Sequence, residues 1–474
     1  MKKLFLIALL PLFTIVACRK DLTSLNVDPK NPQSAPSSAF FTSGQKAMTD
    51  LLTSTNVNDN IFRLIVQYWT ETTYTDESNY DIVTRQIPRQ IWNGLYRDVI
   101  RDFREAKKLI PDQVANADVQ QNQLAIAEIM EVMAWYYLVT TFGDIPYTEA
   151  LEINTLQPKY DNQKTIYLDL LSRLNDAIAD LDEGAASFGS ADLIYGGDVE
   201  MWQKFANSFK VKMGMTIADD DNTLARSTVE SAVAAGVFTS NADNATFTYQ
   251  TSPPNTNPVW VDLVQSGRKD FVVTNTIVNK MEALNDPRLD DYFSFDNTGS
   301  DYSGGIPGAG NNFATFSKPA DAIQAPEFPA LLMSYDEVEF FLAEAAQRGY
   351  NVGGTAIQHY NNAVTASILY WGGTTTEATA YLLQPSVIYD PVNWKARIGE
   401  QKWLALYNRG WDAWIEWRRL DAPAIAAPPT AVSATPLRYT YPIPEQNLNT
   451  ANYNAAASAV GGDAVTTKLF WDKF

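Results

Sequence analysis

The sequence predicts a mainly α-helical protein, with paired helices that carry a loop-rich face containing few short strands. Apolar residues recur at helical spacing in several segments, and glycines follow many of these segments. One long stretch between them is instead rich in Pro, Gly, Asn and Ser. Apolar side chains at intervals of three and four residues line one face of a helix, whereas Pro and Gly favour turns. We therefore expect loops laid over a helical scaffold.

The predicted scaffold begins with residues 121–142, which are apolar nearly all round and so indicate a buried helix. Residues 163–183 carry their apolar residues on one face, which predicts an amphipathic helix. The next helix follows Asp198, which can cap its N-terminus. Its apolar positions are Met201, Trp202, Phe205, Phe209 and Met213.

Residues 337–348, 355–369 and 394–420 also have helical spacing. Four glycines follow predicted helices and can supply left-handed C-caps: Gly143, Gly184, Gly349 and Gly372. By length and period the helices form units of tetratricopeptide size, 121–142 with 165–181 and 337–348 with 355–369. Exact sequence repeats are absent, so this pairing depends on helix length and period alone.

Residues 242–330 form the loop-rich stretch, with a short strand possible at 245–250. Ligand-binding residues often lie on loops of this kind, held in place by a rigid scaffold. We expect a single domain over residues 41–474, with residues 242–330 on one of its faces.

The N-terminus predicts an exported lipoprotein. Lys2 and Lys3 precede an apolar run too short to span a membrane, which is typical of a signal peptide over residues 1–17. The run ends Ile-Val-Ala-Cys, a bacterial lipobox, so Cys18 is the expected lipidation site. Residues 18–40, which are polar and contain three prolines, would tether the domain to a membrane.

Composition excludes several classes of function. Cys18 is the only cysteine and His359 the only histidine, so a disulfide framework, a cysteine zinc site and a histidine-rich metal site are all excluded. The formal charge of -19 disfavours nucleic acid and anionic lipid head groups as partners. We expect no cofactor and no bound metal.

Nine ordered segments resemble the SusD/RagB family of outer-membrane nutrient-binding lipoproteins, in particular its SusD-like branch. They are LNVDP at 25–29, QYWTET at 67–72, FGDIPY at 142–147, NPVW at 257–260, SGR at 266–268, DPRL at 286–289, LAEA at 342–345, residues 411–419, and YPIPEQ at 441–446. Each segment alone is weak evidence, but together with the lipobox they occur in the right order along nearly the whole chain after Cys18.

This resemblance implies a helical fold with tetratricopeptide-like helix pairs and a protein that binds without turnover. It also implies a partner, a SusC-like TonB-dependent β-barrel transporter in the outer membrane, on whose outer mouth the protein sits as a lid. The ligands of such proteins are mainly oligosaccharides, and peptides in the RagB-like members. The resemblance does not decide between these ligands.

The first candidate ligand-binding stretch is residues 69–81, where aromatic side chains alternate with carboxylates and an amide. Aromatic faces can contact the C–H groups of a sugar while polar groups bond its hydroxyls. The candidate residues are Trp69, Tyr74, Asn79 and Tyr80, with Trp92 close enough in sequence to join them. The simpler interpretation, which we favour, is a helix end packed by Trp69 and Tyr80.

Two further candidates lie in the loop-rich stretch. Trp260 precedes Arg268, whose guanidinium could bind a carboxylate or amide of a peptide, although pairing with Asp270 is the favoured interpretation. Asn312 and Phe313 form the third candidate, on composition alone.

Other conspicuous residues have structural explanations. His359 lies within a predicted helix without a nucleophile motif, so an ordinary helix position is favoured over a general base. The acidic run 219–221 lacks the glycine and spacing of a calcium loop, which favours a solvated turn. Four tryptophans of the last predicted helix indicate core positions, namely Trp403, Trp411, Trp414 and Trp417. In the same helix we expect Glu416, Arg418 and Arg419 to form a structural ion-pair set.

Three functions compete. The favoured one is capture of oligosaccharide or peptide at the outer membrane for delivery to the transporter. The alternative is a surface-anchored, all-helical glycoside hydrolase, because hydrolysis needs two suitably spaced carboxylates and the chain has many. The third is a helical-repeat adaptor that binds only protein.

Overall fold

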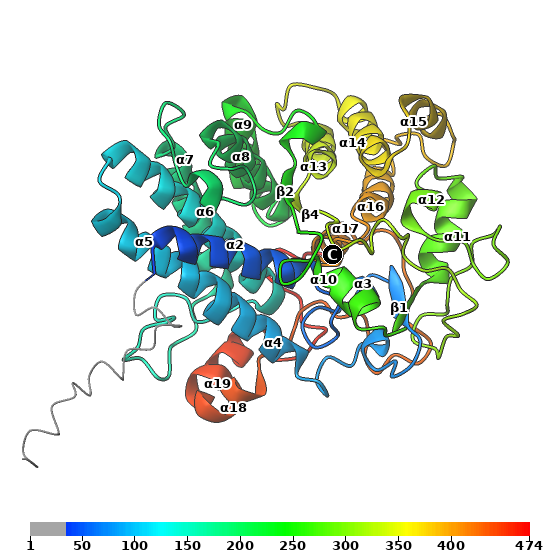
Figure 1. Ribbon diagram of the computed structural model, residues 1–474, viewed down its shortest axis with the longest axis horizontal. Helices are drawn as coiled ribbons and strands as arrows, with labels where there is room; N and C mark the ends of the chain where they lie inside the picture. The colour runs from blue at the N-terminus through cyan, green and yellow to red at the C-terminus, as the bar shows by residue number, and fades with distance from the viewer. Residues whose placement is uncertain (1–34) are drawn as a thin grey trace, which may run out of the picture. The chain divides into compact units, whose positions relative to one another are not determined.

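The scaffold consists of helices that pack in pairs, and the pairs stack in chain order. The computed structural model describes residues 35–474, of which residues 37–474 form one compact unit. Within this part of the chain four pairs have the bounds α6 Ala117–Phe142 with α7 Gln163–Ala179, α8 Val199–Thr216 with α9 Asn222–Ala235, α13 Tyr335–Gln347 with α14 Ala356–Trp371, and α16 Trp394–Ala405 with α17 Gly410–Leu420. α7 contacts α8, α8 contacts α13, and α13 contacts α16, so the pairs form a continuous row (Figure 1).

The predicted helix pairs are confirmed, because α6 packs on α7 and α13 on α14. α6 begins four residues before its predicted start, since the Asn116 side chain accepts hydrogen bonds from the N–H groups of Asp118 and Val119. By length and composition α6 could cross a membrane, but 89% of its apolar window is buried inside the protein. The prediction of a buried helix is therefore confirmed.

Most of the predicted caps are present. The Asp198 side chain accepts from the Met201 N–H, as predicted. Thr355, which was not predicted as a cap, forms a reciprocal capping box with Gln358. Gly143, Gly349 and Gly372 follow helices with positive φ. Gly184 was wrongly predicted as a cap, because α7 already ends at Ala179 and Gly184 lies in the turn that follows.

The predicted helix 394–420 is wrong as a single element, because it is broken between α16 and α17. Asn408 has a φ of 70° there, in the left-handed region. A Cβ atom on Gly410 would lie 2.5 Å from the backbone nitrogen of Arg63. The chain therefore turns at this point so that α17 can approach the backbone of α3 (Phe62–Ile65) closely.

Several elements before α6 and after α17 were not predicted. They are α2 Ser37–Thr53, α3 Phe62–Ile65, β1 Trp69–Glu71, the 3-10 helix η2 Glu77–Asn79, α4 Ile87–Asn93, the π-helix η3 Gly94–Ile100, α5 Arg101–Gln113, the 3-10 helix η4 Gly189–Ala191 (between α7 and α8), α18 Ile443–Leu448 and α19 Thr450–Ala459. α2 packs on α5, and α5 on α6, so these helices extend the first pair. Helix α2 already starts within the predicted tether 18–40, while residues 1–34, with the predicted signal segment and Cys18, lie outside the described residues.

The loop-rich stretch enters between the second and third helix pairs. Its elements are η5 Asn241–Asp243, β2 Ala245–Phe247, α10 Pro258–Trp260, the π-helix η6 Val261–Gln265, β3 Phe271–Val273, α11 Asn275–Leu284, α12 Leu289–Tyr292 and β4 Ala330–Met333; α15 Thr375–Leu382 follows α14. β2 pairs with β4 and β3 with β1, both antiparallel. The short strand expected at 245–250 is thus present, whereas α11 was not predicted.

Buried ion pairs join the scaffold helices to one another. Lys212 of α8 lies 2.9 Å from Glu337 of α13 and contacts Asp412 of α17, and Arg409 contacts both of these acids at 2.7 Å. Lys212, Glu337 and Asp412 are almost fully buried. Burial alone would raise the pKa of Asp412, but the adjacent Lys212 and Arg409 cations lower it to about 2. These charges are therefore fully paired where water does not reach them.

A second buried cluster confirms part of the predicted ion-pair set. Arg419 contacts Glu416 and Glu344, and Lys402 pairs with Glu416 at 2.8 Å. Arg418 does not belong to this set. It donates to the carbonyl oxygens of Thr140 and Leu437, and its guanidinium lies 3.4 Å from the ring centroid of Trp414. As predicted, Trp403, Trp411 and Trp414 are core residues, and Trp417 is partly buried.

Candidate ligand-binding site

Three loops that contain sequence-predicted site residues meet at Thr72. The Thr72 N–H donates to the Asp270 carbonyl oxygen at 2.8 Å, and its hydroxyl donates to the Lys269 carbonyl oxygen at 2.6 Å. The Asn311 N–H in turn donates to the Thr72 carbonyl oxygen at 3.0 Å. These bonds continue the β1–β3 pairing and bring residues 72–80, 266–270 and 306–313 together. We call these three loops the loop site.

The Asn311 side chain holds the third loop in place. Its amide nitrogen is within hydrogen-bond distance of the carbonyl oxygens of Glu71, Ile306 and Ala309, and its oxygen accepts from the Ile306 N–H. A Cβ atom on Gly305 would lie 2.7 Å from this oxygen, so the loop packs closely on the amide. Asn311 is buried and thus positions its neighbours Asn312 and Phe313.

Asn79 links the first loop to two other segments. Its amide nitrogen donates to the Gly308 carbonyl oxygen at 2.8 Å, and its oxygen accepts from the Thr430 hydroxyl at 2.7 Å. Since both ends of the amide are already bonded and Asn79 is buried, its observed role is to join loops.

A reciprocal contact between Glu71 and Ser78 closes the loop that carries Tyr74. The Ser78 N–H donates to the Glu71 carboxylate at 2.9 Å, and the Glu71 N–H donates to the Ser78 hydroxyl at 3.0 Å. Burial, together with the nearby Glu77 carboxylate, raises the pKa of Glu71 to about 8. Arg85 pairs with Glu77. At neutral pH the Glu71 carboxyl is therefore largely protonated.

The loop site presents aromatic and charged groups at the surface. Tyr74 is 77% exposed, with a positive φ of 56° that turns the chain at this residue. Arg268 is exposed and paired with Asp270, as the sequence suggested. Asn312 is exposed, and Phe313 is half-buried with the Lys318 and Lys269 ammonium groups 5.1 and 5.7 Å from its ring centroid.

The other predicted site residues are buried or lie outside the loop site. Trp69 is 1% exposed and donates to the Tyr407 hydroxyl, and Tyr80 is equally buried, so both serve the core in this structure. Trp92 packs against aromatic rings that include Phe142 and is also buried. Trp260 is half-buried at the end of α10. The structure thus leaves Tyr74, Arg268, Asn312 and Phe313 exposed or half-buried on the loop site, whereas Trp69, Tyr80 and Trp92 are buried.

The remaining polar candidates have partners within the fold. His359 Nδ1 lies 2.7 Å from Glu339. Asp219 pairs with Arg348, Asp220 with Lys164 and Lys473, and the Asp221 side chain caps α9. Among the residues that the structure describes, no cluster of three or more His, Cys, Asp or Glu side chains could hold a metal ion.

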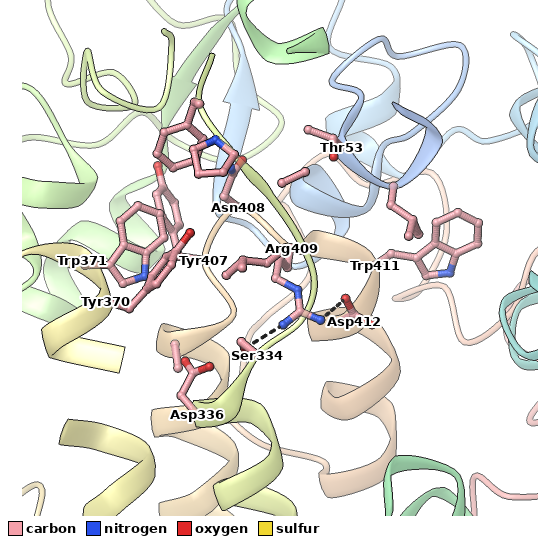
Figure 2. A pocket seen from close by; sticks show the side chains of 16 residues that line it. Thr53, Ser334, Asp336, Tyr370, Trp371, Tyr407, Asn408, Arg409, Trp411 and Asp412 are labelled. Carbon is pink, nitrogen blue, oxygen red and sulfur yellow. Dashed lines mark hydrogen bonds and ion pairs between the residues drawn. The ribbon is translucent and has the colours of Figure 1, made fainter. Parts of the chain in front are cut away.

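A small inner pocket lies between the scaffold and the loop-rich stretch. It has a volume of about 40 Å³, and Trp371, Tyr370 and Tyr407 lie together on one side of it (Figure 2). Arg409 reaches between Ser334 and Asp412 in the same view. Asp336 is buried here, and its burial raises the pKa of its carboxyl.

A larger cavity of about 460 Å³ shares four wall residues with the inner pocket, namely Phe328, Pro329, Tyr370 and Trp371. Its other walls are Asp290 and Asp291 of α12 with Ala320 and Ala322. We call it the outer cavity. The sequence analysis missed it, although an adjacent Tyr and Trp immediately before Gly372 and Gly373 could have indicated aromatic rings at an open helix end.

Comparison with known proteins assigns the family. A profile of the SusD-like family described as "Starch-binding associating with outer membrane" matches residues 29–442. The chain belongs to this SusD-like family. Members of the family associate with the outer membrane and bind carbohydrate. The family match confirms the predicted resemblance, and the helices described above confirm the predicted helical fold. No curated protein matches the chain.

Solved structures of similar proteins have the same fold. A chitin-binding protein is 25% identical, with a TM-score of 0.80, over 92% of this chain and all of that one. A SusD-like protein from Bacteroidetes is 22% identical with a TM-score of 0.83, over 93% of this chain and all of that one. A chitin-binding SusD homologue from Flavobacterium johnsoniae is 23% identical with a TM-score of 0.79, over 91% of this chain and 98% of that one.

Proposed function

We propose that this protein captures an oligosaccharide at the outer surface of the outer membrane and delivers it to a SusC-like TonB-dependent β-barrel transporter. In this proposal the ligand binds at the loop site, and a lipid on Cys18 holds the protein at the membrane. The observation that carries the proposal is the convergence of three loops at Thr72 in a protein of a carbohydrate-binding family.

The chemistry of the loop site supports a sugar ligand. A flat aromatic ring packs against the C–H face of a sugar ring, and Tyr74 and Phe313 offer two such rings. Exposed polar groups beside them, Arg268 and Asn312, can bond to hydroxyl groups. A peptide is the other ligand that this proposal admits, because Arg268 could bind its carboxylate in place of Asp270.

Binding can be tested by calorimetry with a panel of soluble oligosaccharides. β-1,4-linked N-acetylglucosamine oligomers belong in this panel because two proteins of similar structure are chitin-binding. We expect Tyr74→Ala to weaken the affinity of the bound glycan by about tenfold, since one aromatic contact contributes about 0.5–1.5 kcal/mol beyond its buried area. The control is Phe474→Ala, which removes an aromatic residue that is also exposed but lies outside the loop site. Equal affinities for both variants would reject this site.

Delivery can be tested by affinity purification from detergent-solubilised outer membranes. A large TonB-dependent barrel recovered in near-equal amount would support the transport proposal, and Cys18→Ser should release the protein from the membrane fraction. The glycoside hydrolase alternative predicts new reducing ends when purified protein is incubated with the same glycans. Such release, abolished by a single carboxylate-to-amide change, would replace our proposal.

A further inference from the structure

The outer cavity combines aromatic walls with acids that have no ionic partner. Tyr370 and Trp371 end α14 with their ring centroids 5.6 Å apart and their planes at 88°, and Phe328 stacks on Trp371 at 6.2 Å. Asp290 and Asp291, which belong to α12, also line the cavity. Within residues 35–474 neither acid forms an ion pair with a lysine or an arginine.

Other carboxylates add to this negative charge. Glu377, at the start of α15, acts electrostatically on Asp291, and Asp291 Oδ1 would lie 3.2 Å from a Cβ atom on Gly372. Burial first, and then repulsion from Asp290 and Glu377, raises the pKa of Asp291 to about 6. A cation beside Asp291 would relieve this repulsion.

The inner pocket behind the shared wall offers a further polar group. The Arg409 side chain is nine-tenths buried, and its Nε–H has no hydrogen-bond partner among the described residues. Its terminal nitrogens already contact Glu337, Asp412 and Ser334. The guanidinium charge is therefore balanced within the core. The free Nε–H remains a donor for one oxygen atom. The inner pocket, at about 40 Å³, has room for about three water molecules beside it.

We propose that the outer cavity binds a sugar residue that carries a free primary ammonium group. The ammonium donates to the carboxylates of Asp290 and Asp291, and the sugar ring lies against Trp371. The cavity volume of about 460 Å³ is in the range of small-molecule sites, about 300–1,000 Å³. The choice of a sugar rests on the proposed carbohydrate capture, whereas the requirement for a positive charge rests on the unpaired acids alone.

A lysine side chain is the other source of a primary ammonium. It would need only a narrow channel for its methylenes, whereas this cavity has broad aromatic walls on one side. An amino sugar fills both features at once, because it has a ring face for the aromatic wall and an amine for the acids.

The experiment is a calorimetric titration at pH 7 with a β-1,4-linked glucosamine tetrasaccharide and with its fully N-acetylated counterpart. It uses the full-length protein, with and without Tyr74→Ala. The variants are Asp291→Asn, Trp371→Phe, and Asp301→Asn as a matched control, since Asp301 is an exposed acid that does not line the cavity. Asn has the shape of Asp without its charge, so Asp291→Asn should fold normally.

We expect Asp291→Asn to weaken the affinity for the free-amine tetrasaccharide about fivefold in both Tyr74 backgrounds. Trp371→Phe should weaken it by a similar factor, and Asp301→Asn should leave it unchanged. Raising the salt concentration from about 50 to about 500 mM should also weaken it, because the contact is ionic. The N-acetylated tetrasaccharide should not respond to Asp291→Asn.

Three results would overturn the inference. The first is an affinity for the free-amine tetrasaccharide that Asp291→Asn does not change. The second is an equal effect of Asp291→Asn on both tetrasaccharides, which would show that the cavity does not select charge. The third is an Asp291-dependent site that takes a short lysine-containing peptide but not the amino sugar. The loop site is tested separately. If Tyr74→Ala does not change the affinity for the N-acetylated tetrasaccharide, the proposed loop site is wrong, whatever the result at the outer cavity.

Discussion

In the scaffold, buried ion pairs join helices that lie far apart in the sequence. In the loop site, by contrast, side-chain amides join the loops by hydrogen bonds to backbone carbonyl oxygens. Lys212, Glu337 and Asp412 connect α8, α13 and α17. Asn79 and Asn311 instead bond to carbonyl oxygens of neighbouring loops. An ion pair stripped of one partner leaves a buried charge, whereas a lost amide leaves neutral groups. Removal of one of these polar side chains should therefore destabilise the protein more in the scaffold than in the loop site.

The largest effect is expected in the scaffold. Lys212→Met leaves Glu337 and Asp412 with Arg409 as their only cation, so we expect the free energy of unfolding to fall by about 3–5 kcal/mol. Urea denaturation measures this. The control is Lys204→Met, because Lys204 pairs with Glu200 at the surface and should contribute no more than about 1 kcal/mol. Similar losses for both variants would remove the distinction between the two regions.

A smaller effect is expected from Asn311→Ala, which leaves loop carbonyl oxygens without their donor. We expect unfolding to require about 1–3 kcal/mol less, together with weaker ligand binding at the loop site. Asn312→Ala is the matched neighbour, since within residues 35–474 the exposed Asn312 side chain bonds only to the Ala314 N–H. If Asn312→Ala destabilises the protein as much as Asn311→Ala, the role assigned to Asn311 is wrong.

The loop that carries Tyr74 should depend on pH through Glu71. A carboxyl whose pKa is raised on folding, from 4.5 to about 8, stabilises the folded state most at low pH. This stabilisation is lost as the pH rises from about 4.5 through about 8, because over that range the Glu71 carboxyl ionises in the unfolded state but stays protonated in the folded state. We expect the protection of the amides of residues 72–80, measured relative to their intrinsic exchange rates at each pH, to fall over that range in the wild type. Glu71→Gln should remove this pH dependence. If the pH dependence persists in the variant, a group other than Glu71 causes it.

The smallest effect on stability is expected for Tyr74→Ala, in contrast to its effect on binding. Because the ring is mostly exposed, its removal should change the free energy of unfolding by less than about 0.5 kcal/mol. Thermal unfolding followed by circular dichroism gives the value. A larger loss would show that Tyr74 supports the loop itself, and the binding defect could then not be assigned to direct contact.

The scaffold was largely predictable because local signals determine it. The nearly continuous apolar run of α6, the apolar periods of α7 and α8, and the cap at Asp198 are visible in a single sequence. The break between α16 and α17 was not, because Gly410 is needed only for its approach to Arg63, a residue far away in the chain. The apolar spacing is continuous across this break, and Asn408 and Gly410 are only weak local signals of it.

The candidate site was only partly predictable, for the same reason. Composition identified all three loops of the loop site, but it could not separate the exposed Tyr74 from the buried Trp69 five residues earlier. That difference arises because β1 pairs with β3 and places Trp69 in the core, a contact between segments some 200 residues apart. The outer cavity was missed altogether, since its walls come from α12, α14 and the segment between β3 and β4.

The β2–β4 pair has a consequence for how this protein could diversify. These strands lie at the two ends of the loop-rich stretch, so the chain leaves the scaffold and returns to it at neighbouring points. For a loop with fixed ends, each doubling of length costs only about 0.6 kcal/mol in closure entropy. Insertions into exposed turns between the strands, such as residues 297–300, can therefore accumulate with little penalty to the stacked helices, whereas the buried residues of β3, α11 and α12 must be kept. A lineage could in this way acquire new ligands by exchanging one segment of its gene.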